Sequence, residues 1–555
     1  MNDRNIFERN MLALSAKNPL LCQRLSRANP QKGMYIFERA RNGSPVPLWA
    51  LHKEKPVPLH SLIDPDREGE RLIETSFSGR EGSLIFLGLG GGYALRSAIS
   101  RSTIHHITII DFHIDGIAEL FSHIDYVPIL TDPRVDLLID PDKKEVQEYL
   151  ISKYAPVFWG NLNILSLRNR YQSEETLFSE LQRWISEGLE QVGEDFSVQA
   201  LFGKRWFSNI IRNMLFSSPE TTPLPPVRNV AITAAGPSLE KHLTSLKKNR
   251  RDFFLLATDT SLSALLLSNI VPDGVVSIDC QHISYHHFLK GIPDKVFLFA
   301  DLASPPSVVQ RSRHTYFFAG GHPLTRYLVQ WWRSFPVVDT SGGNVTYAAV
   351  SLAEQLGARS IRLYGADFSY PEGKTYARGT YVYDVFQGKQ SRFAPLESIL
   401  SAFLFRSPSL EKKVDSRGWR YETKPLTTYR LRLERLAQHL SVPITASEGD
   451  GSPLTLPSLS SPVTSNTLSV FGPGRQALSA RDFLSEYSEK IRRLPSPKGI
   501  PFGKYLAQRS GEELGILMTL APLAAALRHR QKELSLWELF EMVVTRALTE
   551  IEQFL

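Results

Sequence analysis

Polar side chains follow several short apolar stretches in the middle of this 555-residue sequence, where predicted strands end. Thr258 and Asp259 follow FFLLA, Asp279 and Gln281 follow GVVSI, and Asp367 follows SIRLYGA. In doubly wound sheets ligands bind outside the carboxyl ends of the strands, so these side chains are expected to line one pocket. A pocket of this composition suits a sugar nucleotide or a nucleoside triphosphate.

A turn in ITAAGPSLEKHL precedes these strand ends in the chain. Gly236 and Pro237 form the turn, and Ser238 stands where a helix is expected to begin. The amides of Gly236, Ser238 and Leu239 would then point outward and hold a phosphate, with the Ser238 hydroxyl beside them. The alternative for this turn taken alone is a structural helix cap.

Two neighbouring segments could complete the chemistry. QHISYHHF contains His286 and His287, either of which could act as a general base because imidazole titrates near neutral pH; a pair could also bind a metal. The glycine-punctuated loop around Lys374, Tyr376 and Arg378 suits a phosphate or a sugar carboxylate. The alternatives are ordinary surface histidines and a solvated loop.

A further polar position is Asn344, in the second glycine turn GGNV, which could be a helix cap or a contact to a base or ribose.

The amino-terminal part contains a second glycine-rich turn, FLGLGGGYALRS, with Gly88, Gly90 and Gly92. Asp111 ends the next predicted strand about twenty residues on, where an acid could bind ribose hydroxyls. This is a second possible nucleotide site. The alternative is a tight strand-to-helix turn that needs glycine whether or not it binds a ligand.

The periodicity predicts an α/β protein. We expect a helix from Ile6 to Arg27 and then a Rossmann-like domain with a helical extension, residues 1–216. The proline-rich SSPETTPLPPVR is a linker candidate. A doubly wound, mostly parallel domain is expected over 226–440, a Ser/Pro/Thr-rich linker over 441–474 and a helical region over 475–555.

Composition excludes several classes of protein. Hydrophobic residues make up 42% and charged residues 22%, which is typical of globular proteins. A net charge of +7 is too small for its length to indicate nucleic-acid binding, and two cysteines cannot form a disulfide framework or a thiolate metal site. No signal peptide or charge-free stretch of about twenty residues is evident. We expect a cytoplasmic protein that does not span a membrane.

Several long segments resemble the motility accessory factors. They are AAGPSLE, ATDTSLSALLLSNIVPDGVVSIDCQ, GGNVTYAAVSLAEQLGARSIRLYGADFSYPEGKTYARGTY and RWFSNIIRNML. The central domain of this family is also similar to the archaeal 6-hydroxymethylpterin diphosphokinase, the MptE-like type. The resemblance covers most of the chain and implies a sialyltransferase-like central domain.

The resemblance implies a glycosyltransferase that moves a nonulosonic acid, pseudaminic or legionaminic, from a CMP-activated donor to Ser or Thr of flagellin, as flagellar assembly and motility require. Ala234 stands where the family commonly has glycine. The implied donor-phosphate residues are Gly236, Pro237 and Ser238. Thr258, Asp259, Asp279 and Gln281 would line the cytidine and sugar pocket, with Asn344, Asp367 and Tyr376 nearby.

The expected catalysis needs few groups. Lys374 or Arg378 would stabilise the departing phosphate, and the base would be Asp279, His286 or His287. CMP leaves with one phosphate, so no cofactor is required, and Mg²⁺ is optional. Two alternatives remain: an ATP- and Mg²⁺-dependent pterin diphosphokinase using acids such as Asp259, Asp279 and Asp367, or a non-catalytic flagellin-binding factor. The particular sugar, the acceptor residues and the oligomeric state stay open.

Overall fold

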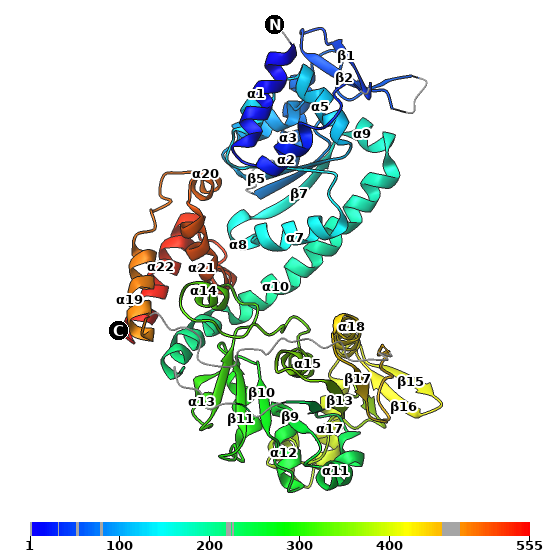
Figure 1. Cartoon of the computed structure of the whole chain (residues 1–555), viewed down its shortest axis with the longest axis vertical. Helices are drawn as coiled ribbons and strands as arrows, with labels where there is room; N and C mark the ends of the chain where they lie inside the picture. The colour runs from blue at the N-terminus through cyan, green and yellow to red at the C-terminus, as the bar shows by residue number, and fades with distance from the viewer. Residues whose placement is uncertain are drawn as a thin grey trace. The chain divides into compact units, whose positions relative to one another are not determined.

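The computed structural model describes residues 3–31, 33–51, 55–77, 82–217, 224, 227–457 and 478–555 (Figure 1). The chain forms two compact units. Unit 1 comprises 1–203, 493–517 and 521–545, and unit 2 comprises 204–492, 518–520 and 546–555. The predicted linker at 217–228 lies largely outside the described residues. In the described part of the chain, no helix has both the length and the apolar character needed to cross a membrane.

Unit 1 is built on a parallel sheet of four strands in the order β6-β5-β4-β7. The strands are β4 (Gly82–Leu87), β5 (Ile104–Asp111), β6 (Val135–Ile139) and β7 (Asn161–Ser166). The first strand in sequence lies inside the sheet and the next two follow on one side, which is the order of a Rossmann half. The Rossmann-like prediction is confirmed.

Helices and a small antiparallel sheet surround these strands. The predicted single helix from Ile6 to Arg27 is instead two helices, because Asn18 caps a new helix that starts at Pro19. The elements are α1 (Asp3–Ser15), α2 (Pro19–Leu25), β1 (Tyr35–Arg39), β2 (Pro45–Trp49), β3 (Val57–Pro58), α3 (Pro65–Ser76), α4 (Tyr93–Ser100), α5 (Ile114–His123), α6 (Val127–Leu130), α7 (Lys143–Lys153), α8 (Pro156–Trp159), α9 (Arg168–Ser173) and α10 (Glu175–Phe216), which contributes to both units.

Unit 2 contains a seven-stranded parallel sheet in the order β12-β11-β10-β9-β8-β13-β17. Its strands are β8 (Asn229–Thr233), β9 (Phe254–Thr258), β10 (Gly274–Ser277), β11 (Phe297–Asp301), β12 (Thr315–Phe318), β13 (Ser360–Tyr364) and β17 (Ile444–Ala446). Leu256, Val276 and Phe299 are fully buried in its core. The doubly wound prediction is confirmed. Residues 444–446, expected in a linker, instead pair with β13, and Ile444 is buried in this core.

The helices of this unit connect its parallel strands. They are α11 (Leu239–Lys248), α12 (Asp259–Leu267), α13 (Pro306–Val309), α14 (Pro323–Trp331), α15 (Val345–Gln355), α16 (Tyr381–Gln387), α17 (Leu396–Phe405) and α18 (Lys424–His439), with a 3₁₀ helix η1 at His282–Phe288. A second small sheet, β14-β16-β15, consists of β14 (Tyr370–Pro371), β15 (Glu411–Asp415) and β16 (Gly418–Glu422).

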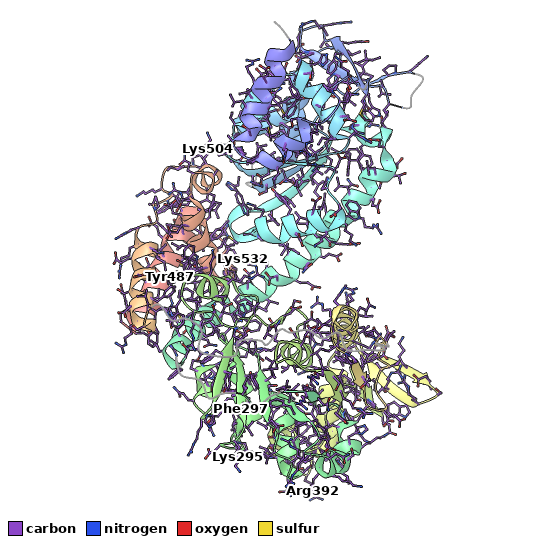
Figure 2. All side chains as sticks on the ribbon, viewed as in Figure 1. Lys295, Phe297, Arg392, Tyr487, Lys504 and Lys532 are labelled. Carbon is purple, nitrogen blue, oxygen red and sulfur yellow. The ribbon has the colours of Figure 1, made fainter. Side chains whose placement is uncertain are left out.

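The carboxyl-terminal region is helical, as predicted: α19 (Ala480–Arg492), α20 (Phe502–Ala507), α21 (Gly511–Arg530) and α22 (Leu536–Glu552). Its apolar side chains face inward at the expected helical spacing, and Leu517, Leu520 and Phe540 are buried. In unit 2 the buried hydroxyl of Tyr487, labelled in Figure 2, lies 2.5 Å from that of Thr519.

Candidate functional site

The carboxyl edge of the unit 2 sheet holds the predicted site residues. β8 lies inside the sheet, β9 to β12 follow on one side of it, and β13 and β17 lie on the other. The order of the strands therefore reverses between β8 and β13, which is where open α/β sheets bind ligands. The turn after β8 and the loop after β13 meet at this point, since Ala234 donates from its amide to the Tyr364 carbonyl at 2.8 Å.

The turn at Gly236–Leu239 does not present an open phosphate cradle. The Gly236 amide donates to the Gly365 carbonyl (2.9 Å), the Ser238 amide to Oδ2 of Asp367 (2.8 Å), and the Leu239 amide to the Gly236 carbonyl (3.0 Å). The expectation that these amides face a ligand is therefore wrong for this structure. The carboxylate of Asp367 occupies the place foreseen for a phosphate oxygen.

Other contacts hold this arrangement closed. Ser238 does not cap its helix with its side chain; its Oγ instead accepts from the Asp450 amide at 3.0 Å. Pro237 is buried in the same turn. Gly451 approaches so closely that a Cβ there would lie 2.5 Å from the Cα of Asp367. Burial raises the pKa of Asp367, and donation from Ser238 opposes that rise.

Asp259 and Asp279 lie at the ends of the adjacent strands β9 and β10. Asp259 is buried, and its carboxylate accepts from the Thr260 amide (2.7 Å) and the Ser277 hydroxyl (3.1 Å). Asp279 is partly exposed and accepts from the Gln281 amide at 2.9 Å. Burial raises the pKa of Asp279, and the charge of Asp259 raises it further, so the two acids are electrostatically coupled.

Thr258, the last residue of β9, has a buried hydroxyl without a hydrogen-bond partner in the described part of the chain. Its position fits the predicted pocket, and a buried hydroxyl of this kind is available to a ligand or water.

The 3₁₀ helix η1 brings an imidazole to these acids, and the start of α16 brings a phenol. The ring of His287 makes an edge contact with Tyr381, with centroids 4.3 Å apart, and His286 lies farther from the same phenol at 6.3 Å. The positive charge of His287, when protonated, lowers the pKa of Asp279. Burial raises the pKa of Tyr381, and the charges of Asp259 and Asp279 contribute. We call Asp259, Asp279, His287 and Tyr381 the acid–imidazole–phenol cluster.

The predicted cations have other partners. Nζ of Lys374 bonds to the exposed carboxylate of Glu372 at 3.0 Å, and the Arg378 amide donates to Glu240 at 2.8 Å. Burial raises the pKa of Tyr383 on α16, and the charge of Arg378 opposes that rise. Arg406, which sequence analysis missed, follows α17 and stacks its guanidinium 3.8 Å over Phe403.

The charge of Arg406 reaches three tyrosines. Burial raises the pKa of Tyr370, Tyr376 and Tyr381, and the positive charge of Arg406 opposes this at each. Tyr376, a predicted site residue, packs its ring 6.4 Å from that of Phe403. No local motif marks Arg406, because only the chain's return after α17 places it beside these phenols.

Asn344 is a helix cap. Its Oδ1 accepts from the Tyr347 amide at 3.0 Å at the start of α15. The structure thus favours the capping alternative, although a cap does not prevent the side-chain NH₂ from contacting a ligand.

The second possible nucleotide site, in unit 1, is filled by protein groups. Gly88, Gly90 and Gly92 have positive φ, and the turn is buried. The Leu89 amide donates to Asp111 at 2.6 Å. The fully buried Asp111 also pairs with Arg170 at 3.3 Å. An acid so engaged cannot accept from ribose hydroxyls, and the expectation of an open site here is wrong for this structure.

No group of three or more His, Cys, Asp or Glu side chains in the described ranges is arranged to hold a metal ion.

Comparison with known proteins agrees with this architecture. The family model of 6-hydroxymethylpterin diphosphokinase MptE-like proteins matches residues 205–373. An uncharacterized protein of Treponema pallidum (strain Nichols) is 33% identical over 154 residues, covering 27% of this chain and 54% of that protein. Another from the same organism is 29% identical over 176 residues, covering 31% of this chain and 84% of the relative. The chain thus spans about half the length of the former.

A solved structure extends the similarity to the whole chain. The MAf glycosyltransferase from Magnetospirillum magneticum AMB-1 matches with a TM-score of 0.58 and 13% identity, over 99% of this chain and 95% of that chain. Residues 205–373 thus match the MptE-like family model, and the fold of the chain is similar over 99% of its length to that of a MAf glycosyltransferase.

Proposed function

We propose that this protein is a glycosyltransferase that transfers a nonulosonic acid from a CMP-activated donor to Ser or Thr hydroxyls of flagellin, and thereby supports flagellar assembly. The observation that carries the proposal is the acid–imidazole–phenol cluster at the carboxyl ends of β9 and β10. It provides a base, a coupled acid and hydrogen-bond donors in one place. The fold shared with a MAf glycosyltransferase supports the reaction class.

In the proposed reaction Asp279 removes the proton of the acceptor hydroxyl as its oxygen attacks the anomeric carbon. The bond to the CMP phosphate breaks, and CMP leaves with the electron pair. Asp279 suits this step because it is partly exposed and its raised pKa brings it toward the working pH. Arg406 and the phenol of Tyr376 would stabilise the departing phosphate.

The test compares a variant at Asp279 with a control variant at a nearby residue outside the cluster. Asp279→Asn should lower kcat for CMP release in the presence of flagellin by about 10²- to 10⁴-fold while the Kd for CMP changes little. The exposed His282 supplies the control, since His282→Gln should leave kcat within about twofold. Intact-mass analysis of flagellin reports the transferred sugar. An unchanged flagellin mass with the wild-type enzyme and donor contradicts the proposed function.

One other function is favoured by a specific observation, the match of residues 205–373 to the diphosphokinase-like family. A diphosphokinase would use ATP and Mg²⁺, with acids holding the metal. Asp259 and Asp279 are coupled, but Asp367 is engaged by Ser238, which makes a three-acid site the weaker fit. Calorimetry with CMP and with ATP plus Mg²⁺ separates the two, since only a diphosphokinase should bind ATP in preference to CMP.

A further inference from the structure

The β15–β16 hairpin has two chemically different faces. The strands pair antiparallel, with Lys412 opposite Tyr421 and Val414 opposite Trp419. Because side chains alternate along a strand, these four lie on one face. The charged residues Glu411, Lys413, Asp415, Arg420 and Glu422 lie on the other. The hairpin is drawn in yellow in Figure 1.

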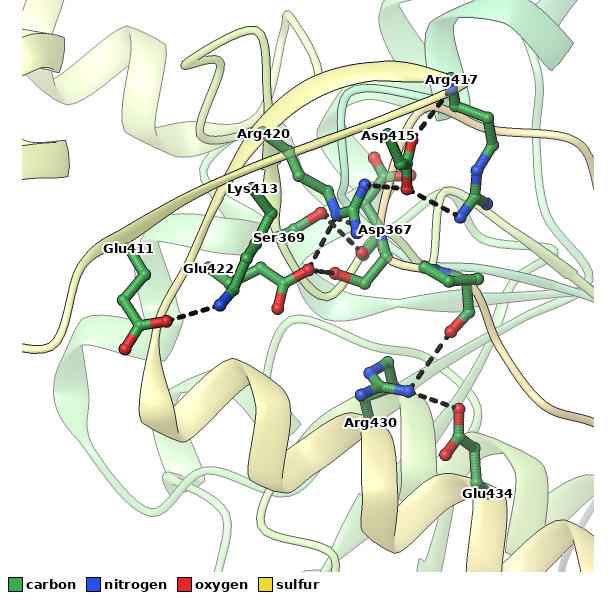
Figure 3. Close-up of polar contacts among 12 residues, drawn as sticks. Asp367, Ser369, Glu411, Lys413, Asp415, Arg417, Arg420, Glu422, Arg430 and Glu434 are labelled. Atoms are coloured by element: carbon green, nitrogen blue, oxygen red, sulfur yellow. Dashed lines mark hydrogen bonds and ion pairs between the residues drawn. The ribbon is translucent and has the colours of Figure 1, made fainter.

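The charged face is bonded internally and to the body of unit 2 (Figure 3). Arg420 is buried, and its guanidinium donates to Asp415 at 2.6 Å and to Glu422 at 2.8 Å. The Ser452 hydroxyl, from the loop after β17, also donates to Glu422 at 2.8 Å. The hydrogen bonds and ion pairs of Arg420 and Glu422 are therefore satisfied within the protein.

The apolar face is exposed as well. Val414 is 73% exposed and Trp419 38%. Phe405, at the end of α17, is 59% exposed and packs its ring 5.4 Å from Tyr421. Apolar side chains that gather on an exposed face are typical of an interaction surface. We call Phe405, Lys412, Val414, Trp419 and Tyr421 the outer hairpin face.

Lys412 places a cation on this face that has no acidic partner in the described part of the chain. Its Nζ lies 4.8 Å over the Trp419 ring. The positive charge is therefore available to an incoming carboxylate. The face thus complements a partner that combines apolar side chains with acidic ones.

The backbone of β15 could also bind a partner, along the open edge of the small sheet. β15 is the edge strand of the order β14-β16-β15, and all five of its residues are exposed. An exposed edge can accept an extended peptide as an additional strand. The chain beside this face also leads toward the cluster, because Phe403 contacts Tyr376, and the charge of the cluster residue Tyr381 acts on Tyr376.

We propose that the outer hairpin face docks the acceptor polypeptide, as an extended segment carrying apolar side chains and carboxylates that adds along β15. This inference rests on the proposed function, since it supplies the acceptor side of that reaction. It assigns the hairpin the role of presenting a hydroxyl-bearing segment to the cluster, and it requires no change in the donor site.

The test uses the full-length protein with flagellin as the probe. Val414→Glu should raise the Kd for flagellin and the KM for flagellin at least about tenfold, because it places an acid on an apolar site for an acidic partner. The KM for the donor should stay within about twofold of the wild-type value. So should the rate of CMP release when water replaces flagellin as the acceptor. The control Val271→Glu makes the same change at a 44% exposed position at the amino end of β10, and should leave both flagellin constants unchanged.

Two separate measurements distinguish this proposal from the proposed function. If the wild-type protein releases no CMP, the transferase function is refuted. Flagellin affinity is measured without donor, so the effect of Val414→Glu on the Kd for flagellin still tests the docking surface. Wild-type flagellin binding that Val414→Glu leaves intact overturns the docking surface. Two other results also overturn it, because another occupant then covers the face. One is a wild-type dimer that Val414→Glu makes monomeric. The other is that Val414→Glu abolishes binding to anionic lipid vesicles and retains the affinity for flagellin.

Discussion

Asp301 offers a quantitative test of the electrostatics at the sheet edge. It ends β11, is 1% exposed, and accepts from the Ala303 amide at 2.8 Å. Burial raises the pKa of Asp301 to about 7 from an ordinary value of 3.8. The unfolded chain therefore releases this proton near pH 4, whereas the native protein keeps it until about pH 7. The contribution to stability is complete below pH 4 and is lost as the pH rises to 7.

The magnitude follows from the difference in pKa. About three pKa units at 1.36 kcal/mol each give about 4 kcal/mol, lost at about 1.4 kcal/mol per pH unit between pH 4 and 7. Asp301→Asn keeps the oxygen that accepts from Ala303 but cannot ionise. We subtract the free energy of opening of the variant from that of the wild type. This difference should therefore fall by about 4 kcal/mol between pH 4 and pH 7, and it should stay constant above pH 7.

Hydrogen exchange of a peptide covering Phe297–Asp301, corrected for the intrinsic rate at each pH, measures that free energy in the intact protein. Asp294→Asn is the control, because Asp294 forms a surface pair with Arg313 and its side chain is 64% exposed. The difference in opening free energy between the wild type and Asp294→Asn should not vary by more than about 1 kcal/mol between pH 4 and pH 7. A constant difference for Asp301→Asn between pH 5 and 7 would refute the reasoning, since it would mean that the native carboxyl is already ionised.

Three further predictions concern packing and charge. Arg170→Met should destabilise unit 1 by about 3–5 kcal/mol in urea unfolding, because it leaves Asp111 buried without its partner, and adding Asp111→Asn should recover part of the loss. Gly451→Ala should cost about 1–3 kcal/mol by the same measurement, since its Cβ would meet the Asp367 backbone, whereas Gly515→Ala in open space on α21 should be neutral or stabilising. Arg406→Ala should raise the donor KM about tenfold in a CMP-release assay with Tm unchanged, and an unaltered KM would remove this cation from the donor site.

Much of the fold follows from local patterns. The parallel strands of both sheets were predictable because each is a short apolar run followed by a turn and a helix. The placement of Asp259 and Asp279 together was predictable too, since consecutive parallel strands end at one edge. The edge strand β17 was not, because its three residues lie in a Ser- and Pro-rich stretch, and only Ile444 among them is buried once the strand pairs with β13.

By itself the sequence determined the class of fold, and it placed acids and imidazoles after the strands of the unit 2 sheet. Only the tertiary structure decided that Asp367 bonds to Ser238, 129 residues away, and that Arg170 reaches Asp111 across 59 residues to fill the unit 1 turn. It also decided that the charge of Arg406 acts on Tyr370, Tyr376 and Tyr381. The physical reason is that local periodicity records which face of an element is buried, whereas the partner of a charge depends on where distant segments return.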